Sequence, residues 1–320
     1  MDGIAVGVFG TDSQTKSLFE GAVAKKSEAE GMVVYTRVEG GRRYSFLDTS
    51  DYPERIQGYS RVASIVDHAL YFYPSSGRMA APNGELAVLV GAFGLEGTLV
   101  LTGGAPGPEV AGAVLKGTPV AGYTPDIRDL RSSAIDLSRA SPRSDFPNEQ
   151  TLIYMDRVFT VKGVGTVALG FVLSGKVSIH DQLRPIPGPN DLRVDVKGIQ
   201  VNDVDFESAG RGIRVGLSLR GVDTKDLEKS HWLDDGALQL SDSPSFELAK
   251  SPYYKQEVTS RDLHVQLPGE IVSARMADSG NGRVTVRLPS QIPVWEGMRA
   301  AVVDLNGGNL RIAGGLTSKF

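Results

Sequence analysis

Apolar and polar residues in the first 137 positions follow two different spacings. Short apolar runs of strand length recur, and between them apolar residues return every three to four positions, as on one face of a helix. The predicted strands are Ile4–Phe9, Met32–Val38, Arg43–Leu47, Ala69–Tyr73, Thr98–Leu101 and Pro119–Tyr123, and the predicted helices are Gln14–Lys25, Arg61–Asp67, Gly84–Phe93, Glu109–Leu115 and Asp126–Leu137. Because helices separate most of the strands, we expect an α/β domain with a mostly parallel sheet and helices on both faces.

The spacing changes after a short polar segment. Residues 138–150 hold few apolar side chains and two prolines, which is typical of a linker. Beyond it, apolar residues alternate with polar ones and glycine turns replace helices, which predicts two β-barrels. The predicted strands of the two barrels are Leu152–Val161, Gly165–Leu173, Leu192–Val201, Ile213–Leu219, Glu257–Val265, Glu270–Met276, Arg283–Leu288, Met298–Val303 and Leu310–Ile312. We therefore expect an α/β domain over 1–137, a linker over 138–150, and barrels over 151–243 and 244–320.

Composition narrows the classes of function. The chain has no cysteine and four scattered histidines, which excludes disulfides and cysteine nucleophiles and disfavours a metal site built from protein ligands. The net charge of −4 argues against a general polyanion binder, so DNA is not an expected partner. No apolar run reaches the length of a membrane span, and the first residues lead into a strand without a secretory signal. We expect a cytoplasmic protein with no membrane partner.

The turn between the first strand and the first helix lies where a phosphate-binding P-loop belongs. Gly10–Ser17 keeps three of the four fixed positions of G-x-x-x-x-G-K-[ST], but Thr15 replaces the second glycine. That glycine lets backbone N–H groups close around phosphates, so a β-branched residue crowds the nucleotide. The pattern predicts a P-loop descendant that binds phosphate poorly. The alternative is an ordinary turn, with Ser13 or Thr11 as the helix cap and Lys16 in solvent.

Four segments of the first predicted barrel carry a distinctive order and spacing: Asp156–Thr166, Leu173–Val177, Ile199–Asp203 and Val215–Val222. They resemble the second domain of elongation factor Tu and, more closely, of selenocysteine-specific SelB factors. Ser251–Lys255 and Arg311–Gly315 similarly resemble the third domain of this family, and the N-terminal order of elements matches its GTPase domain. The resemblance covers essentially the whole chain. It implies a P-loop GTPase-like domain followed by two antiparallel β-barrels.

The resemblance also locates the guanine-nucleotide motifs, most of which are changed. Val33 stands where the family holds magnesium, Asp51 where it senses the γ-phosphate, and Tyr52 where it positions water. The guanine-reading motifs are replaced at Ala105 and at Gly122–Thr124. This implies a pseudo-GTPase with no catalytic residue. The remnants of the phosphate and magnesium site are Gly10, Lys16, Ser17 and Asp48. They bind either no cofactor or GTP or GDP with magnesium weakly, or they serve only the fold.

In the family, the second domain holds the aminoacylated 3′ end of tRNA. By resemblance, that pocket is lined here by Asp156, Arg157, Gln200 and Arg214. The two arginines suit an anionic or strongly polar partner. The alternative is structural: Asp156 and Arg157 form an ion pair at a strand edge, and Arg214 belongs to a solvated barrel face.

Three hypotheses about function remain open at this point. The first is a nucleotide-independent adaptor that binds aminoacyl-tRNA, or another translation component, through the two barrels, with the ribosome as a candidate partner. Such a protein is similar to the elongation-factor-like proteins associated with pyrrolysine in methanogenic archaea. The second is a working GTPase with divergent motifs. The third is a protein-protein scaffold in translation that no longer binds RNA. Nucleotide and tRNA binding distinguish them.

Overall fold

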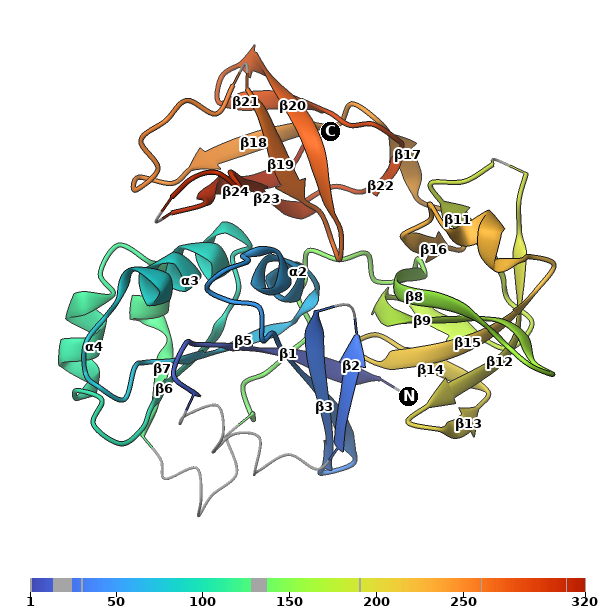
Figure 1. Ribbon diagram of the computed structural model, residues 1–320, viewed down its shortest axis with the longest axis horizontal. Coiled ribbons are helices and arrows are strands. Elements are labelled where there is room, and N and C mark those ends of the chain that lie inside the picture. Colours follow the sequence, from blue (N-terminus) through green and yellow to red (C-terminus); the bar gives the residue numbers. More distant parts are fainter. Residues whose placement is uncertain are drawn as a thin grey trace.

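The computed structural model describes residues 2–13, 25–29, 31–127, 137–189, 191–259, 261–308 and 310–319, with the backbone alone given for 25–29. Residues 14–24 of the helix predicted over Gln14–Lys25, and most of the helix predicted over Asp126–Leu137, lie outside these ranges, and Lys25 begins a strand instead. Along the described chain, three bodies of regular structure follow one another (Figure 1). Among the described helices, none is both long and apolar enough to cross a membrane.

The first body is built on a seven-stranded sheet of order β2-β3-β4-β1-β5-β6-β7. Its strands are β1 Gly3–Phe9, β2 Lys25–Ala29, β3 Met32–Glu39, β4 Arg42–Asp48, β5 His68–Phe72, β6 Gly97–Leu101 and β7 Thr124–Ile127. The pairings from β4 through β1, β5 and β6 to β7 are parallel, whereas β2, β3 and β4 form antiparallel hairpins. The turn between β3 and β4 lies at Gly40–Gly41, where both glycines have positive φ angles.

The described helices of this body are α2 Gln57–Ile65, α3 Ala81–Ala92 and α4 Pro108–Val114. Their buried side chains share one hydrophobic cluster with Ala5, Phe9 and Leu47, so they pack on one face of the sheet. The other face buries Ile4 and Val6 together with Leu137 and Ala140.

Two sequence predictions for the first body were wrong. Pro119–Tyr123 is not a strand: Pro119–Gly122 forms a 3₁₀ turn, η1, and the strand is β7, which begins at Thr124. Proline at the first position favours a helical turn because its φ is fixed near the helical value. Consequently the predicted helix cannot begin at Asp126, which belongs to β7.

The second body is a closed sheet in which β11-β16-β8-β9-β15-β12 are joined into a ring by the β11–β12 pairing. Its strands are β8 Leu152–Val161, β9 Gly165–Ser174, β10 Lys176–Ser178, β11 Gln182–Ile186, β12 Val194–Val201, β13 Val204–Phe206, β14 Ser208–Gly210, β15 Arg214–Arg220 and β16 Trp232–Asp234, with a 3₁₀ turn, η2, at Thr224–Leu227. Inward residues such as Val172, Leu217 and Leu233 form its own core.

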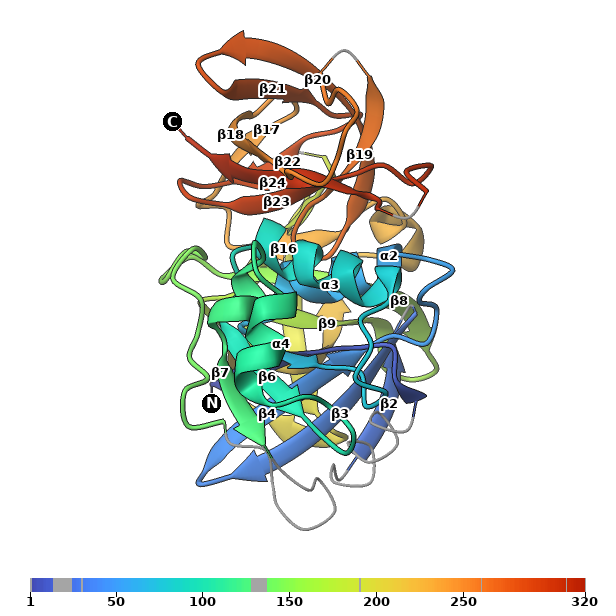
Figure 2. The ribbon, with the colours of Figure 1, turned by 90° about the vertical axis from the view of Figure 1, so that its left-hand side faces the viewer.

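The third body is the closed barrel β18-β21-β20-β19-β23-β24, with a separate two-stranded ribbon of β17 and β22. Its strands are β17 Gln239–Ser241, β18 Ser245–Lys250, β19 Asp262–Gln266, β20 Ile271–Gly280, β21 Arg283–Arg287, β22 Ile292–Val294, β23 Arg299–Val303 and β24 Ile312–Ser318. This barrel lies against α2 and α3, while the second body lies beside the β1–β4 side of the first sheet (Figures 1 and 2). The fold therefore matches the predicted architecture.

The segment predicted as a plain linker is part of the packing between the bodies. Phe146 is only 4% exposed and stacks on Trp295 of the third body, with ring centroids 5.6 Å apart. The guanidinium groups of Arg143 and of Arg211, from the second body, lie 5.2 and 4.9 Å from the Phe146 ring centroid. The Trp295 indole also donates to the Asp145 carbonyl over 2.6 Å. Residues 143–146 thus contact both barrels, which composition alone did not predict.

Candidate functional site

Of the predicted nucleotide remnant, the structure describes Gly10 and Asp48. They lie at the ends of neighbouring strands, and both are within hydrogen-bond distance of one tyrosine hydroxyl. The Tyr59 hydroxyl lies 2.9 Å from both the Gly10 carbonyl oxygen and Asp48 Oδ1. The Thr49 backbone N–H also donates to Asp48 Oδ1, over 2.7 Å. Burial raises the pKa of Tyr59 well above its ordinary value, and the Asp48 carboxylate raises it further. The hydroxyl therefore keeps its proton and donates it to one of the two oxygens at a time.

The start of the P-loop-like segment is tied to the loop after β5. Asp12 accepts hydrogen bonds from the Ser75 hydroxyl and, over 3.0 Å, from the Ser75 backbone N–H. Asn83 donates to the Thr11 hydroxyl over 2.7 Å. Thr11 and Asp12 are thus bonded to the chain's own polar groups. Lys16 and Ser17 lie outside the described residues.

Several of the remaining motif positions lie in packed parts of the first body. Met32 is buried in the main cluster, and Val33 packs against the opposite face of the sheet. Gly104, next to Ala105, passes so close to the Ser75 carbonyl oxygen that a Cβ would lie 2.5 Å from it. Tyr123 donates to the Leu95 carbonyl over 2.7 Å. Within the described ranges, no group of three or more His, Cys, Asp or Glu side chains could hold a metal ion.

Tyr52, predicted at the position of the water-positioning histidine, belongs to a network that crosses between two bodies. Its hydroxyl lies 2.6 Å from the Pro82 carbonyl oxygen and 3.0 Å from Glu85 Oε2. Glu85 in turn pairs with Arg311 of the third body, whose Nη2 is 2.6 Å from Oε2 and whose backbone N–H donates to Oε1 over 2.6 Å. Burial and the Glu85 carboxylate raise the pKa of Tyr52 far above its ordinary value.

The second body brings two of its predicted site residues into one row. Gln200 of β12 pairs with Gly216 of β15, Gly216 with Leu169 of β9, and Leu169 with Arg157 of β8. Gln200 and Arg157 are both exposed, whereas Ile199, next to Gln200 in β12, is buried in the barrel core. We call Arg157, Leu169, Gly216 and Gln200 the outer row. It faces away from the core of the barrel.

The other two predicted residues form a partly buried ion pair behind this row. Arg214 Nε and Nη2 lie 2.8 and 2.9 Å from the two carboxylate oxygens of Asp156, whose side chain is fully buried. The β8–β9 register shifts between Met155 and Arg157, so Asp156 sits in a bulge. A bulge re-aims its side chain. Asp156 therefore pairs with Arg214, and the proposed strand-edge pair of Asp156 with Arg157 was wrong.

Sequence reasoning missed Tyr59, Glu85 and Arg311, which hold the remnant site and its neighbourhood together. Glu85 did carry a signal, because it is the one charged residue in α3, a helix otherwise rich in apolar side chains. Tyr59 gave none, since a tyrosine on a helix face is more often core than site. Arg311 was noticed only as part of a family-like segment.

Comparison with known proteins places this geometry in context. No family model matches the chain. An uncharacterised protein of Methanocaldococcus jannaschii is 26% identical over 319 residues, 98% of this chain and 99% of that protein. The selenocysteine-specific elongation factor of the same organism is 41% identical over 73 residues, and that of Mus musculus is 28% identical over 151 residues. These two matches span only 15% and 25% of the factors' own lengths.

Solved structures agree with the architecture. SelB from Methanococcus maripaludis, in complex with a GTP analogue, superposes with a TM-score of 0.77 at 20% identity, over 100% of this chain and 80% of that one. A bacterial selenocysteine-specific factor gives 0.80 at 18% identity, over 99% of this chain and 58% of that one. The chain therefore has the fold of these SelB structures, and parts of its sequence are similar to selenocysteine-specific elongation factors.

Proposed function

We propose that this protein binds aminoacyl-tRNA through the outer row of its second body. The observation that carries the proposal is the exposure of Arg157 and Gln200 on one row of paired residues. Arginine and amide side chains suit the phosphates, hydroxyls and base edges of a single-stranded RNA end, and Leu169 offers an apolar surface for stacking. Asp156 neutralises Arg214, so Arg214 acts by positioning β8 and β15 rather than by contacting RNA.

We also propose that GTP binding and hydrolysis are lost or weak. The described residues do not fit a magnesium-nucleotide: the Asp48 carboxylate is bonded to Tyr59 and Thr49, and Asp12 adds a negative charge beside the P-loop-like turn. Carboxylates repel phosphate, and each lost hydrogen bond removes roughly 0.5–3 kcal/mol of binding. Calorimetry with GTP, GDP and magnesium tests this, because tight guanine-selective binding would favour the alternative of a working GTPase.

The experiment for tRNA binding compares charged and uncharged tRNA in a filter assay. The resemblance to pyrrolysine-associated proteins makes pyrrolysyl-tRNA the first charged tRNA to try. Wild type is expected to prefer the charged form and to bind less tightly as salt rises, because phosphate contacts release counterions. Arg157→Ala and Gln200→Ala should each reduce that preference by roughly 0.5–3 kcal/mol. Arg220→Ala, an exposed change on β15 of the same barrel, is the matched control.

Equal affinity for charged tRNA in wild type and both variants, or no tRNA binding by folded wild type, would leave the scaffold hypothesis.

Three further statements remain parts of the proposal: the domain limits at 1–137, 151–243 and 244–320, the cytoplasm as the site of action, and the ribosome as a further partner. Each has its own measurement: limited proteolysis, cell fractionation and cosedimentation with ribosomes.

A further inference from the structure

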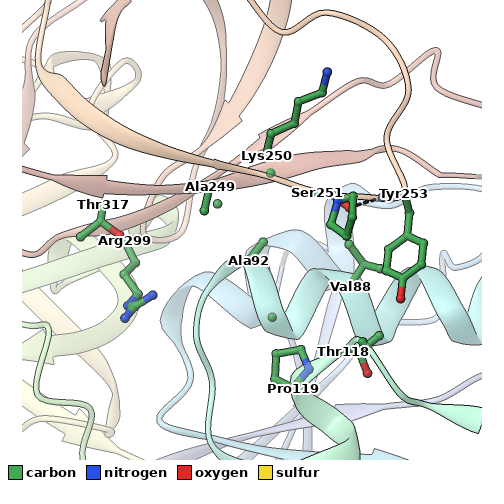
Figure 3. Close-up of a pocket in the computed structure, with 15 residues that line it drawn as sticks. Val88, Ala92, Thr118, Pro119, Ala249, Lys250, Ser251, Tyr253, Arg299 and Thr317 are labelled. Carbon is green, nitrogen blue, oxygen red and sulfur yellow. Dashed lines mark hydrogen bonds between the residues drawn. The ribbon is translucent and has the colours of Figure 1, made fainter. Parts of the chain in front are cut away.

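Two apolar hollows lie where α3 meets the third body, on either side of Tyr253. The first, of about 250 Å³, lies between the C-terminal half of α3, the turn at Gly117–Pro119 and the strands β18 and β24 (Figure 3). The second, of about 270 Å³, lies between the N-terminal half of α3, the end of α4 and Leu310. Val88, Thr118 and Tyr253 border both. We call the two hollows together the α3 groove.

The distance between the two hollows is set by α3, which lines both of them. Gly84 and Val88 line the second hollow, and Val88 and Ala92 line the first, so the hollows are offset by one turn of α3. Four helical residues correspond to a rise of roughly 6 Å. This is also the separation of side chains at positions i and i+4 of another helix. The α3 groove therefore matches a helix that presents two apolar side chains one turn apart.

Exposed apolar side chains gather at this groove. Large apolar residues exposed by 40% or more are few in the described chain. Two of them, Tyr253 at 46% and Val114 at 50%, line the groove, and a third, Val110 at 57%, lies one turn before Val114 on α4. Tyr253 reaches across to the first body, with its hydroxyl 3.5 Å from the Lys116 carbonyl oxygen. Exposed apolar side chains gathered at a hollow mark an interaction site more often than scattered ones do.

The charges around the groove have one sign. Lys116 and Lys250 are exposed lining residues, and Arg299 lines the first hollow with its side chain 39% exposed. Arg299 has a weak partner, since its Nε is 3.8 Å from Asp145 Oδ2. The one carboxylate among the lining residues is Glu85, whose side chain is 2% exposed and paired with Arg311. The rim therefore complements negative charge.

We propose that the α3 groove binds an acidic amphipathic helix of a partner protein, with one apolar side chain in each hollow and carboxylates facing Lys116 and Lys250. Apolar anchors in pockets supply the affinity, and complementary rim charges supply orientation and association rate. The site lies on the first and third bodies, away from the outer row. It does not rest on tRNA or nucleotide binding.

The test uses labelled synthetic helices and fluorescence anisotropy, without tRNA or nucleotide. One peptide carries leucine at two positions four residues apart and glutamate on its polar face, a second replaces the glutamates with lysine, and a third replaces the leucines with alanine. The first should bind with an affinity that falls as salt rises, and the other two at least tenfold more weakly. K116E/K250E should weaken binding of the first peptide at least tenfold and improve binding of the lysine peptide.

The matched control is K176E/K229E, which makes the same charge change at two exposed lysines of the second body. It should leave binding unchanged, and circular dichroism should show all variants folded. Val88→Asp is a second variant that puts a carboxylate between the hollows without touching the rim lysines. Absence of binding by the acidic peptide, equal binding of acidic and basic peptides, or full binding to K116E/K250E would overturn the proposal.

Discussion

Among single residues, Tyr59 most clearly distinguishes the predicted nucleotide remnant from an open nucleotide site, because its hydroxyl bonds to Asp48. Tyr59→Phe removes a donor from the buried Asp48 carboxylate, and we expect a loss of roughly 1.5–3 kcal/mol in unfolding free energy because the acceptor is charged. Tyr123→Phe removes a bond to the neutral Leu95 carbonyl and should cost roughly 0.5–1.5 kcal/mol. Urea unfolding of both variants measures the difference. Equal losses would mean that Asp48 is not held by Tyr59.

His68 makes stability depend on pH. It is buried beside the Thr98 hydroxyl, and burial lowers its pKa from 6.5 to about 4. Because the unfolded chain binds the proton more readily, the contribution of His68 is complete above pH 6.5 and is lost as pH falls towards 4, by roughly 3 kcal/mol in total. His68→Gln should remove this part of the slope. A pH profile of stability that is the same in both proteins between pH 4 and 6.5 would contradict the assignment.

Individual site residues were predictable only where a local motif carried them. Gly10 follows β1 and Asp48 ends β4, and the motif pattern pointed to both positions. The contacts that decide what Asp48 and Tyr52 now do come from Tyr59, Glu85 and Arg311, and Arg311 lies 226 positions from Glu85 in the sequence. No local spacing reveals such a pair, because it forms only after separate bodies pack together.

Elements were predictable where a single period dominated. The buried strand β1 and the long strands β8 and β9 were located closely. Nearly every position in them fits the residue pattern of a strand that is buried on one face or on both. Helix α2 was predicted four residues too late, since it begins with polar Gln57 and Gly58 after the buried Ile56. The short strands β2, β18 and β24 were missed or truncated, because tertiary pairing rather than propensity fixes them.

At the scale of helices and strands, glycine-to-alanine substitution is expected to change stability in opposite directions at two positions. A Cβ on Gly84 of α3 meets nothing within 4 Å, so Gly84→Ala should stabilise by roughly 0.5–1 kcal/mol through helix propensity. A Cβ on Gly170 of β9 would lie 2.1 Å from the Tyr154 carbonyl oxygen, which forces β8 and β9 apart. Gly170→Ala should therefore destabilise by more than about 1 kcal/mol. Thermal unfolding decides, and stabilisation by both changes would refute the β8–β9 packing.

At the scale of the whole molecule, the three bodies share one hydrophobic cluster and several polar contacts. The loop at Leu267–Gly269 of the third body is central: Arg61 of α2 donates to the Gly269 carbonyl over 2.9 Å, and Trp232 of the second body donates to the Pro268 carbonyl over 2.7 Å. Arg211 of the second body pairs with Asp67 of the first, over 2.5 Å. The sequence predicted the three bodies but not this arrangement, since it rests on contacts between distant segments.

The pair of Glu85 and Arg311 makes the arrangement of the first and third bodies testable. Arg311 also donates to the Pro53 and Glu54 carbonyls, so removing its side chain leaves two carbonyl oxygens and the buried Glu85 carboxylate without the guanidinium that pairs with them. Arg311→Ala should cost roughly 3–5 kcal/mol and raise hydrogen exchange in α3 and β24. Arg220→Ala, which breaks an exposed pair with Asp195, should cost roughly 1 kcal/mol or less.

The double variant Glu85→Gln with Arg311→Met separates a lost charge from lost packing. If the cost of Arg311→Ala comes mainly from an uncompensated carboxylate, neutralising Glu85 while keeping an extended side chain at 311 should recover part of the stability. Hydrogen exchange in α3 should then return towards the wild-type rate, because the helix again packs against β24. If Arg311→Ala costs no more than Arg220→Ala, the hydrophobic cluster alone holds the two bodies together, and the ion pair sets only their register.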